Sequence, residues 1–128
     1  MKLRIMANCY CGSNKSFEDC CQIYINGYQN TPTAETLMRS RYSAYAVGNA
    51  DYLVATTHPS TRKFHKKEAI LEWSKSNNWI KLEILNSTET RVKFNAYYID
   101  YRGKTKIHEE HSTFVLENGN WFYVDGEY

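Results

Sequence analysis

The chain has 128 residues, of which 42% are hydrophobic, and a formal net charge of +2 at neutral pH. This length suits one compact domain with a buried core, and the charge is too small to indicate a nucleic-acid-binding protein by itself. No apolar run approaches the roughly 18 residues that a membrane-spanning helix requires. Only eight residues precede Cys9. We therefore expect no secretory signal, no membrane association and a soluble protein of the cytoplasm.

Cysteines occur only in one short segment near the N-terminus, as Cys9, Cys11, Cys20 and Cys21. Four thiolates within thirteen residues suit tetrahedral Zn²⁺, so we expect one structural zinc ion. Two disulfides are the alternative, but they would hold together only a loop, and a bond between adjacent cysteines would be strained. A reactive or redox-active pair is a further alternative. Lys2, Arg4 and Lys15 are expected to offset the charge of −2 on a four-thiolate zinc centre.

Three helices are expected after this segment, at residues 32–47, 50–57 and 66–77. Residues 22–30 are interpreted as a linker that packs the cysteine segment onto the rest of the protein. Thr31 and Pro32 form a favourable helix start, and Gly48 a favourable helix end. Asn49 is expected to cap the second helix. The basic segment 62–67, which includes His65, is interpreted as a solvated loop that leads into the third helix.

Arg41 lies on the apolar face of the first predicted helix. Leu37, Met38 and Tyr45 share this face at 100° per residue. A buried guanidinium requires either a carboxylate partner or an anionic ligand. We expect a carboxylate. Asp100 is the first choice, and Glu109 and Asp125 are the alternatives.

From Trp79 onward the hydrophobic period changes to two, which is typical of half-buried strands. The expected strands cover residues 79–84, 90–102, 104–117 and 121–124. Arg102–Gly103 and Asn118–Gly119 are predicted hairpin turns, and the second is the stronger signal. Helices followed by an antiparallel meander indicate an α+β fold. The eleven tyrosines suggest a concave or partly wet surface in addition to a core.

The cysteine segment resembles the SEC-C motif, a small zinc-binding module found at the end of many preprotein translocases. The four cysteines match its ligands, and Gly12, Ser13 and Lys15 match its loop. Tyr10 replaces the usual proline and Asn14 the usual glycine. Neither change affects a ligand, and asparagine tolerates the left-handed backbone conformation nearly as well as glycine.

The rest of the chain resembles the YchJ-like family of uncharacterised bacterial proteins. The similarity is carried by residues 32–45, 57–62, 108–114 and 121–126. It implies a nuclear-transport-factor-2-like cone in which three helices pack on a curved four-stranded antiparallel meander. The implied division is a zinc knuckle at residues 1–22 and an α+β domain at residues 31–128. The resemblance implies no assigned activity.

Two kinds of function are compatible with these features. In the one we favour, the zinc knuckle supports binding of another protein, and no catalytic residues are expected. The alternative is a small-molecule-binding protein or enzyme that uses the pocket of the cone, with Arg41, Tyr42, His58, Asp100 and His108 as candidate lining residues. Aspartate and histidine together can act as a general base and its orienting group. Nucleic-acid binding through Lys15 and residues 62–67 has less support.

Overall fold

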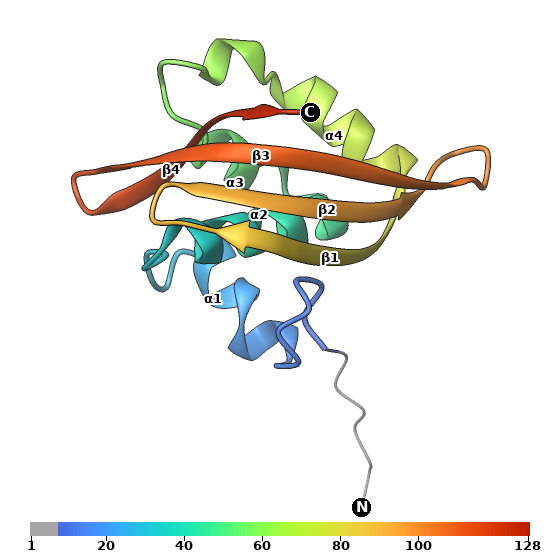
Figure 1. The fold of residues 1–128 in the computed structure, drawn as a ribbon, viewed down its shortest axis with the longest axis horizontal. Coiled ribbons are helices and arrows are strands. Elements are labelled where there is room, and N and C mark those ends of the chain that lie inside the picture. Colours follow the sequence, from blue (N-terminus) through green and yellow to red (C-terminus); the bar gives the residue numbers. More distant parts are fainter. Residues whose placement is uncertain (1–7) are drawn as a thin grey trace, which may run out of the picture.

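The structure is a computed structural model that describes residues 8–128. Lys2 and Arg4 lie outside the described residues. The elements, in chain order, are η1 (Phe17–Asp19), α1 (Cys21–Ile25), α2 (Ala34–Val47), α3 (Ala50–Ala55), η2 (Arg62–Phe64), α4 (Lys67–Ser76), β1 (Asn78–Ser87), β2 (Arg91–Ile99), β3 (Thr105–Glu117) and β4 (Asn120–Glu127). The predicted order of helices followed by an antiparallel meander is confirmed (Figure 1).

The helix boundaries follow from capping residues. Thr33 caps α2 by accepting a hydrogen bond from the Thr36 backbone N–H at 3.0 Å, so this helix begins two residues later than predicted. Gly48 ends it in the left-handed conformation, with φ of 79°, as predicted. Asn49 caps α3, also as predicted, through a 3.0 Å bond from the Tyr52 N–H.

One short helix, α1, lies in the segment that was interpreted as a linker. Ile25 at its end packs against both hydrophobic clusters of the protein. This burial stabilises a helix that is too short to be predicted from periodicity. Cys21 is the first residue of this helix and is buried in the same cluster as Leu37 of α2.

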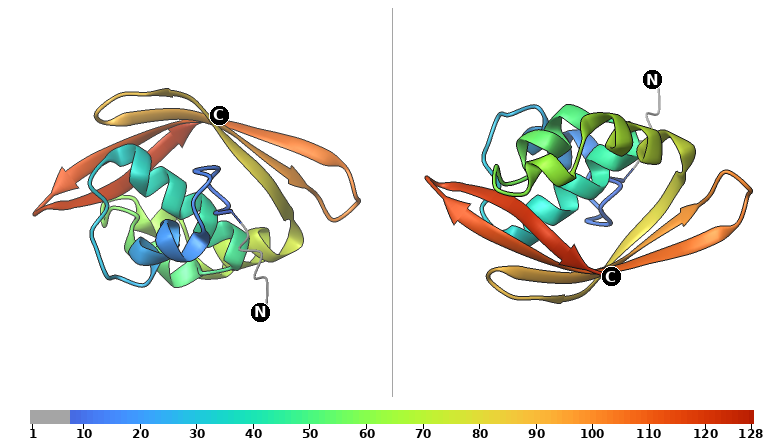
Figure 2. Two further views of the ribbon diagram at one scale, coloured as in Figure 1. Left: turned by 90° about the horizontal axis from the view of Figure 1, so that it is seen from below. Right: turned by 90° about the horizontal axis from the view of Figure 1, so that it is seen from above.

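The sheet has the order β1-β2-β3-β4, and all neighbouring strands are antiparallel. Irregular register occurs twice between β1 and β2 and once between β3 and β4, at Thr113/Phe114. Such bulges bend a sheet and increase its twist. Figure 2 shows that the sheet is strongly bent and that the helices lie within its concave side.

Both predicted hairpin turns are present. Asn118 and Gly119 have φ of 53° and 79°, as a two-residue hairpin turn between β3 and β4 requires. Between β2 and β3, the Asp100 side chain accepts hydrogen bonds from the N–H groups of Arg102 and Lys104 at 2.9 and 3.0 Å. Asp100 is therefore a turn-forming residue at the end of this hairpin.

The main hydrophobic cluster joins the cysteine segment to the rest of the protein. Cys9, Cys11 and Cys21 are buried in the same cluster as Leu37 of α2 and Leu82 of β1. The knuckle therefore packs on the α+β body, although the predicted boundaries at residues 22 and 31 stay a prediction. Within the described residues, no helix has the length and apolar character needed to cross a membrane.

Candidate functional site

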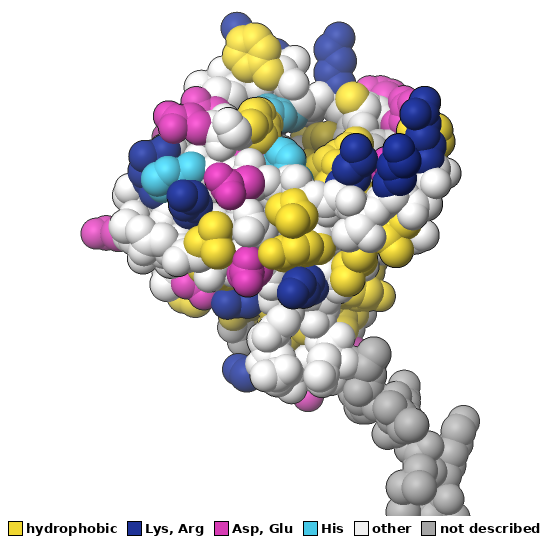
Figure 3. Space-filling model, turned by 45° about the vertical axis from the view of Figure 1, so that its right-hand side comes forward, with side chains coloured by type: hydrophobic (Ala, Val, Ile, Leu, Met, Phe, Trp, Pro, Cys, Tyr) yellow, Lys and Arg dark blue, Asp and Glu magenta, His cyan; other side chains and the backbone are white. Residues whose placement is uncertain are grey.

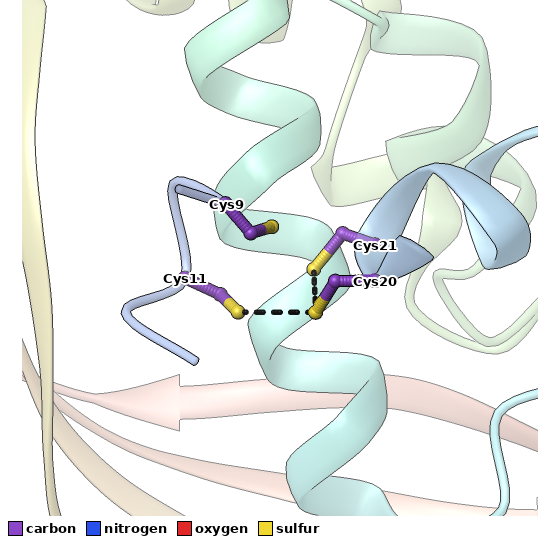
Figure 4. A group of neighbouring side chains, drawn as sticks. All are labelled: Cys9, Cys11, Cys20 and Cys21. Atoms are coloured by element: carbon purple, nitrogen blue, oxygen red, sulfur yellow. Dashed lines mark hydrogen bonds between the residues drawn. The ribbon is translucent and has the colours of Figure 1, made fainter. Parts of the chain in front are cut away.

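The four cysteine sulfur atoms form one compact group beside α2 (Figure 4). All four Sγ atoms lie within 4.8 Å of one another, and the Cys11–Cys20 and Cys20–Cys21 distances are 3.7 and 4.0 Å. All four cysteines are free. Zinc–sulfur bonds of about 2.3 Å in a tetrahedron require sulfur atoms about 3.8 Å apart. The donor set and its spacing therefore fit a metal ion.

Local backbone geometry places these sulfur atoms. The Cys9 N–H donates to the Lys15 carbonyl at 2.6 Å, and the Gly12 N–H donates to the Cys9 carbonyl at 3.2 Å. Gly12 and Asn14 both have positive φ, of 84° and 67°. Asn14 thus adopts the left-handed conformation that the motif usually assigns to glycine.

Neighbouring side chains surround the sulfur group with donors. The Ser13 hydroxyl donates to Cys20 Sγ at 3.1 Å, and the Ser43 hydroxyl lies 3.5 Å from Cys9 Sγ. Arg39 donates from Nη1 to the Cys11 carbonyl at 2.6 Å and pairs with Glu35 through Nε at 3.0 Å. Arg39 brings a positive charge next to the thiolates, whereas the Lys15 side chain is exposed. No local pattern indicated this role for Arg39, because it depends on how the knuckle packs on α2.

The cysteines affect one another's pKa through hydrogen bonds and charge. Hydrogen bonds from the Cys11 and Cys21 thiols lower the pKa of Cys9. Burial raises the pKa of Cys20, and the negative charge of its neighbours adds to this effect. A cluster of this kind ionises fully when a divalent cation binds. Cys9, Cys11 and Cys21 are at most 4% exposed, so four thiolates would enclose the metal and leave no position for water.

A cavity of about 290 Å³ lies between α2, α4 and the concave face of the sheet. This volume is near the lower end of small-molecule sites. Figure 3 shows histidine side chains beside a recess lined by hydrophobic side chains. The walls are mainly aromatic, from Tyr45, Trp73, Trp79, Phe94, Tyr123 and Tyr128. Sequence reasoning did not identify them individually, although the number of tyrosines pointed to a concave surface.

Glu110 is the acidic residue of this cavity and is only 7% exposed. Its carboxylate accepts hydrogen bonds from His108 Nε2 at 2.8 Å, from the Ser112 hydroxyl at 2.6 Å and from the Tyr123 hydroxyl at 2.9 Å. Burial raises the pKa of Glu110, but the three donors outweigh burial and hold its pKa below the ordinary value. Glu110 is therefore a buried carboxylate that is ionised at neutral pH.

Gly126 on β4 makes room for this carboxylate. It is the register partner of Ser112 on the neighbouring strand β3, and the Glu110 side chain lies against it. A Cβ atom at position 126 would lie 2.6 Å from Glu110 Cγ and would overlap the carboxylate itself. Glycine is thus the residue that allows Glu110 to lie against β4.

Arg41 is the basic residue of the cavity. It is 5% exposed, which confirms the predicted helix register. Its Nη1 donates to the Leu53 carbonyl at 2.9 Å and to the hydroxyls of Thr56 and Thr57 at 2.7 and 3.4 Å. Its guanidinium also lies over the Tyr123 ring, 4.5 Å from the centroid.

The prediction that Arg41 pairs with a carboxylate is wrong for all three proposed partners. Asp100 forms the turn between β2 and β3, and Glu109 and Asp125 are exposed. The C-terminal end of α3 supplies neutral oxygens to Arg41 instead. The buried carboxylate of the cavity belongs to Glu110, one position after the predicted Glu109. Residues 108, 110 and 112 share the inner face of β3. The alternation that placed His108 on this face could have identified it.

The other predicted pocket residues divide into two groups. Tyr42 and His108 line the cavity together with Arg41. The Tyr42 hydroxyl is buried and has no hydrogen-bond partner among residues 8–128. His58 and Asp100 are not on the wall. His58 instead bonds to Glu117 at 2.6 Å and to Ser60 at 2.7 Å, because the chain after α3 runs along the edge of β4.

His65 was expected to be exposed, and this expectation is wrong. The turn at η2 brings its ring against Tyr123, with centroids 5.7 Å apart, and His65 lines the cavity. Burial lowers the pKa of His65, and the positive charge of Arg41 lowers it further. His65 is consequently a neutral imidazole at physiological pH.

Comparison with known proteins identifies one matching family and several relatives of similar sequence. The family described as "YchJ, middle NTF2-like domain" matches residues 33–126. A UPF0225 protein of Vibrio vulnificus is 44% identical over 95% of this chain and 75% of its own length, and one of Geobacter sulfurreducens is 39% identical over 92% and 77%.

Two solved structures are also similar. One is the solution structure of a SEC-C motif containing protein from Rhodopseudomonas palustris, with a TM-score of 0.86 and 34% identity over 94% of this chain and 98% of that one. The other is the crystal structure of a SEC-C motif containing protein from Psychrobacter arcticus. Its TM-score is 0.78, with 31% identity over 96% and 75% of the two chains.

Proposed function

The chain belongs to the YchJ-like family with a nuclear-transport-factor-2-like domain, and we propose that it binds a small organic molecule in the aromatic cavity of that domain. One observation carries this proposal. Two side chains of opposite charge, Arg41 and Glu110, are both more than nine-tenths buried around the same open space. Burying charges is costly, and convergent polar groups in an aromatic cavity are typical of ligand sites.

The test is a search for ligands with a library of small aromatic fragments, followed by backbone amide chemical shifts of the protein. Binding in the cavity should shift amides near Arg41 and Glu110 and leave those of the β2–β3 turn at Asp100 unchanged. The proposal fails if no fragment binds, or if the shifts map only to the outer face of the sheet.

We further propose that the metal in the cysteine centre is zinc and that its role is structural. Support comes from four thiolate donors, which zinc prefers to harder cations, and from the burial of three of the four cysteines. Elemental analysis of protein purified without chelators should find one zinc per chain. Protein with reduced thiols and no stoichiometric zinc would contradict this.

A second function that we propose for testing is protein binding by the outer surface of the knuckle. Tyr10 is 45% exposed and packs on the Phe17 ring with centroids 5.5 Å apart, and Lys15 of the same segment is also exposed. Tyr10→Ala should weaken the capture of a protein partner from cell lysate and should not lose the metal. Equal capture by the wild type and by Tyr10→Ala would contradict protein binding through this surface. The convergence of polar groups inside the cavity rather than on the knuckle favours the ligand-binding function.

A further inference from the structure

Among the described residues, the Arg41 guanidinium has hydrogen-bond partners at Nη1 but none along the edge that Nε and Nη2 form. Within residues 8–128, the hydrogen bonds of its guanidinium all leave from Nη1, toward Leu53, Thr56 and Thr57. Nε and Nη2 therefore remain available, and Arg41 is part of the cavity wall. A guanidinium offers two parallel N–H groups along such an edge, which matches the two oxygens of a carboxylate.

Glu110 does not occupy this edge, although it lines the same cavity. Three donors hold its carboxylate on the β3–β4 side, and its ion pair is with His108. The Tyr123 side chain separates the two charges, since its ring face contacts Arg41 while its hydroxyl donates to Glu110. The carboxylate of Glu110 is thus bonded to its own donors, and Arg41 has no carboxylate partner among residues 8–128.

The remaining cavity groups favour a ligand with an aromatic body. Tyr42 lines the cavity as part of this aromatic wall, although its hydroxyl is itself buried. The nearby aromatic rings supply flat surfaces on which a planar ring can pack.

Building on the proposed ligand-binding function, we propose that the natural ligand is a small aromatic carboxylic acid whose carboxylate binds the free edge of Arg41. The aromatic part packs between the rings of α4 and the inner face of the sheet. A buried guanidinium without a carboxylate partner is unfavourable in a protein, and an acid ligand would correct this. A neutral analogue of the same shape would leave the free edge of Arg41 without a partner.

The test compares matched acids and amides, namely benzoate, 2-naphthoate and indole-3-acetate with benzamide, 2-naphthamide and indole-3-acetamide. We expect the acids to bind about 10- to 100-fold more tightly than their amides, as hydrogen bonds to a buried charge predict. Arg41→Met should abolish this preference while amide affinity stays within about threefold. Arg102→Met removes the same charge from the exposed β2–β3 turn and should keep the preference.

If Arg41→Met does not fold, Arg41→Lys provides the second variant. Lysine keeps the charge but lacks the paired N–H edge, so the preference should fall without disappearing. The inference is overturned if acids bind no tighter than amides, or if both Arg41 variants keep the full preference. It is also overturned if this panel does not bind while the broad fragment library yields cavity ligands. Failure of that library as well would remove the proposed function itself.

Discussion

The cysteine centre and the aromatic cavity lie on different sides of the same helix, and they differ in how the chain builds them. The centre takes its four cysteines from thirteen consecutive residues, and a few turns and one short helix bring them together. The cavity takes its walls from residues between Met38 and Tyr128, in α2, α4 and all four strands. One site is a local feature of the sequence, whereas the other exists only when the whole domain has folded.

This difference predicts unequal effects of substitution. A change at the centre should affect the metal and the packing of the N-terminal segment. A change in the cavity should affect ligand binding and the polar network of β3, without loss of the metal. The following predictions, from the largest expected effect to the smallest, test this separation.

Cys11→Ser should have the largest effect. Cys11 is fully buried in the cluster that also holds Leu37 and Leu82, and structural zinc contributes directly to folding. We expect loss of the metal and a fall in the melting temperature of about 10 °C or more. Because the strands lie in the rest of the domain, far-ultraviolet circular dichroism at low temperature should be largely retained. Chelation of the wild-type protein should reproduce both results, and an unchanged melting temperature would contradict the shared core.

Glu110→Ala should destabilise the protein by about 3 kcal/mol, because it leaves His108, Ser112 and Tyr123 without their common acceptor. Denaturant unfolding measures the free energy. Glu109→Ala is the matched control, since Glu109 is the exposed neighbour on the opposite face of β3. Metal content should be unchanged in both variants. Similar free energies of unfolding for the two variants would contradict the inward position of Glu110.

The same carboxylate should make stability depend on pH. The pKa of Glu110 is lower in the folded protein than its ordinary value of 4.5. Its contribution is therefore fully present above about pH 4.5 and is lost as pH falls from there through the folded pKa. Glu110→Gln should show a smaller loss of stability in this acidic range than the wild type. Parallel pH profiles would show that Glu110 is not a source of the acid sensitivity.

Gly126→Ala should cost about 1–3 kcal/mol, because the new methyl group overlaps the Glu110 side chain. The effect should be smaller when combined with Glu110→Ala, since the clash is then absent, and a double-mutant cycle measures this coupling. Asp125→Ala, at the exposed neighbouring position, is the control. Strict additivity of the Gly126 and Glu110 changes would contradict the contact.

Ser13→Ala should have the smallest effect on stability. It removes the hydrogen bond from the Ser13 hydroxyl to Cys20 Sγ and the one that this hydroxyl accepts from the exposed Lys15 backbone N–H at 3.2 Å. We expect about a tenfold loss of metal affinity, as for other groups that bond to metal ligands, and little change in the melting temperature of the metal-loaded protein. Competition with a chromophoric chelator measures the affinity. An unchanged affinity would show that this bond does not support the metal centre.

The sequence alone was sufficient to identify the four clustered cysteines and most of the fold. The cap at Asn49, the helix end at Gly48 and the turn at Asn118–Gly119 are local signals, and each was interpreted correctly. The cysteine spacing is also a local signal, and the four sulfur atoms do form one group. The partner of Arg41 was not predictable in the same way. Its acceptors come from the end of α3, where the Leu53 carbonyl and two threonine hydroxyls are brought close by packing. His65 was misplaced for the same reason, because only the turn at η2 directs it inward.

The most direct test of the central claim, that the cavity binds the ligand, is to fill it. Ala96 lies on the inner face of β2, is 3% exposed and lines the cavity, so Ala96→Leu adds three carbon atoms to the open space. Lys93→Leu introduces the same side chain on the exposed face of the same strand. By calorimetry with the tightest fragment, we expect Ala96→Leu to weaken binding at least about tenfold and Lys93→Leu to leave it unchanged. Equal binding by both variants would contradict the claim.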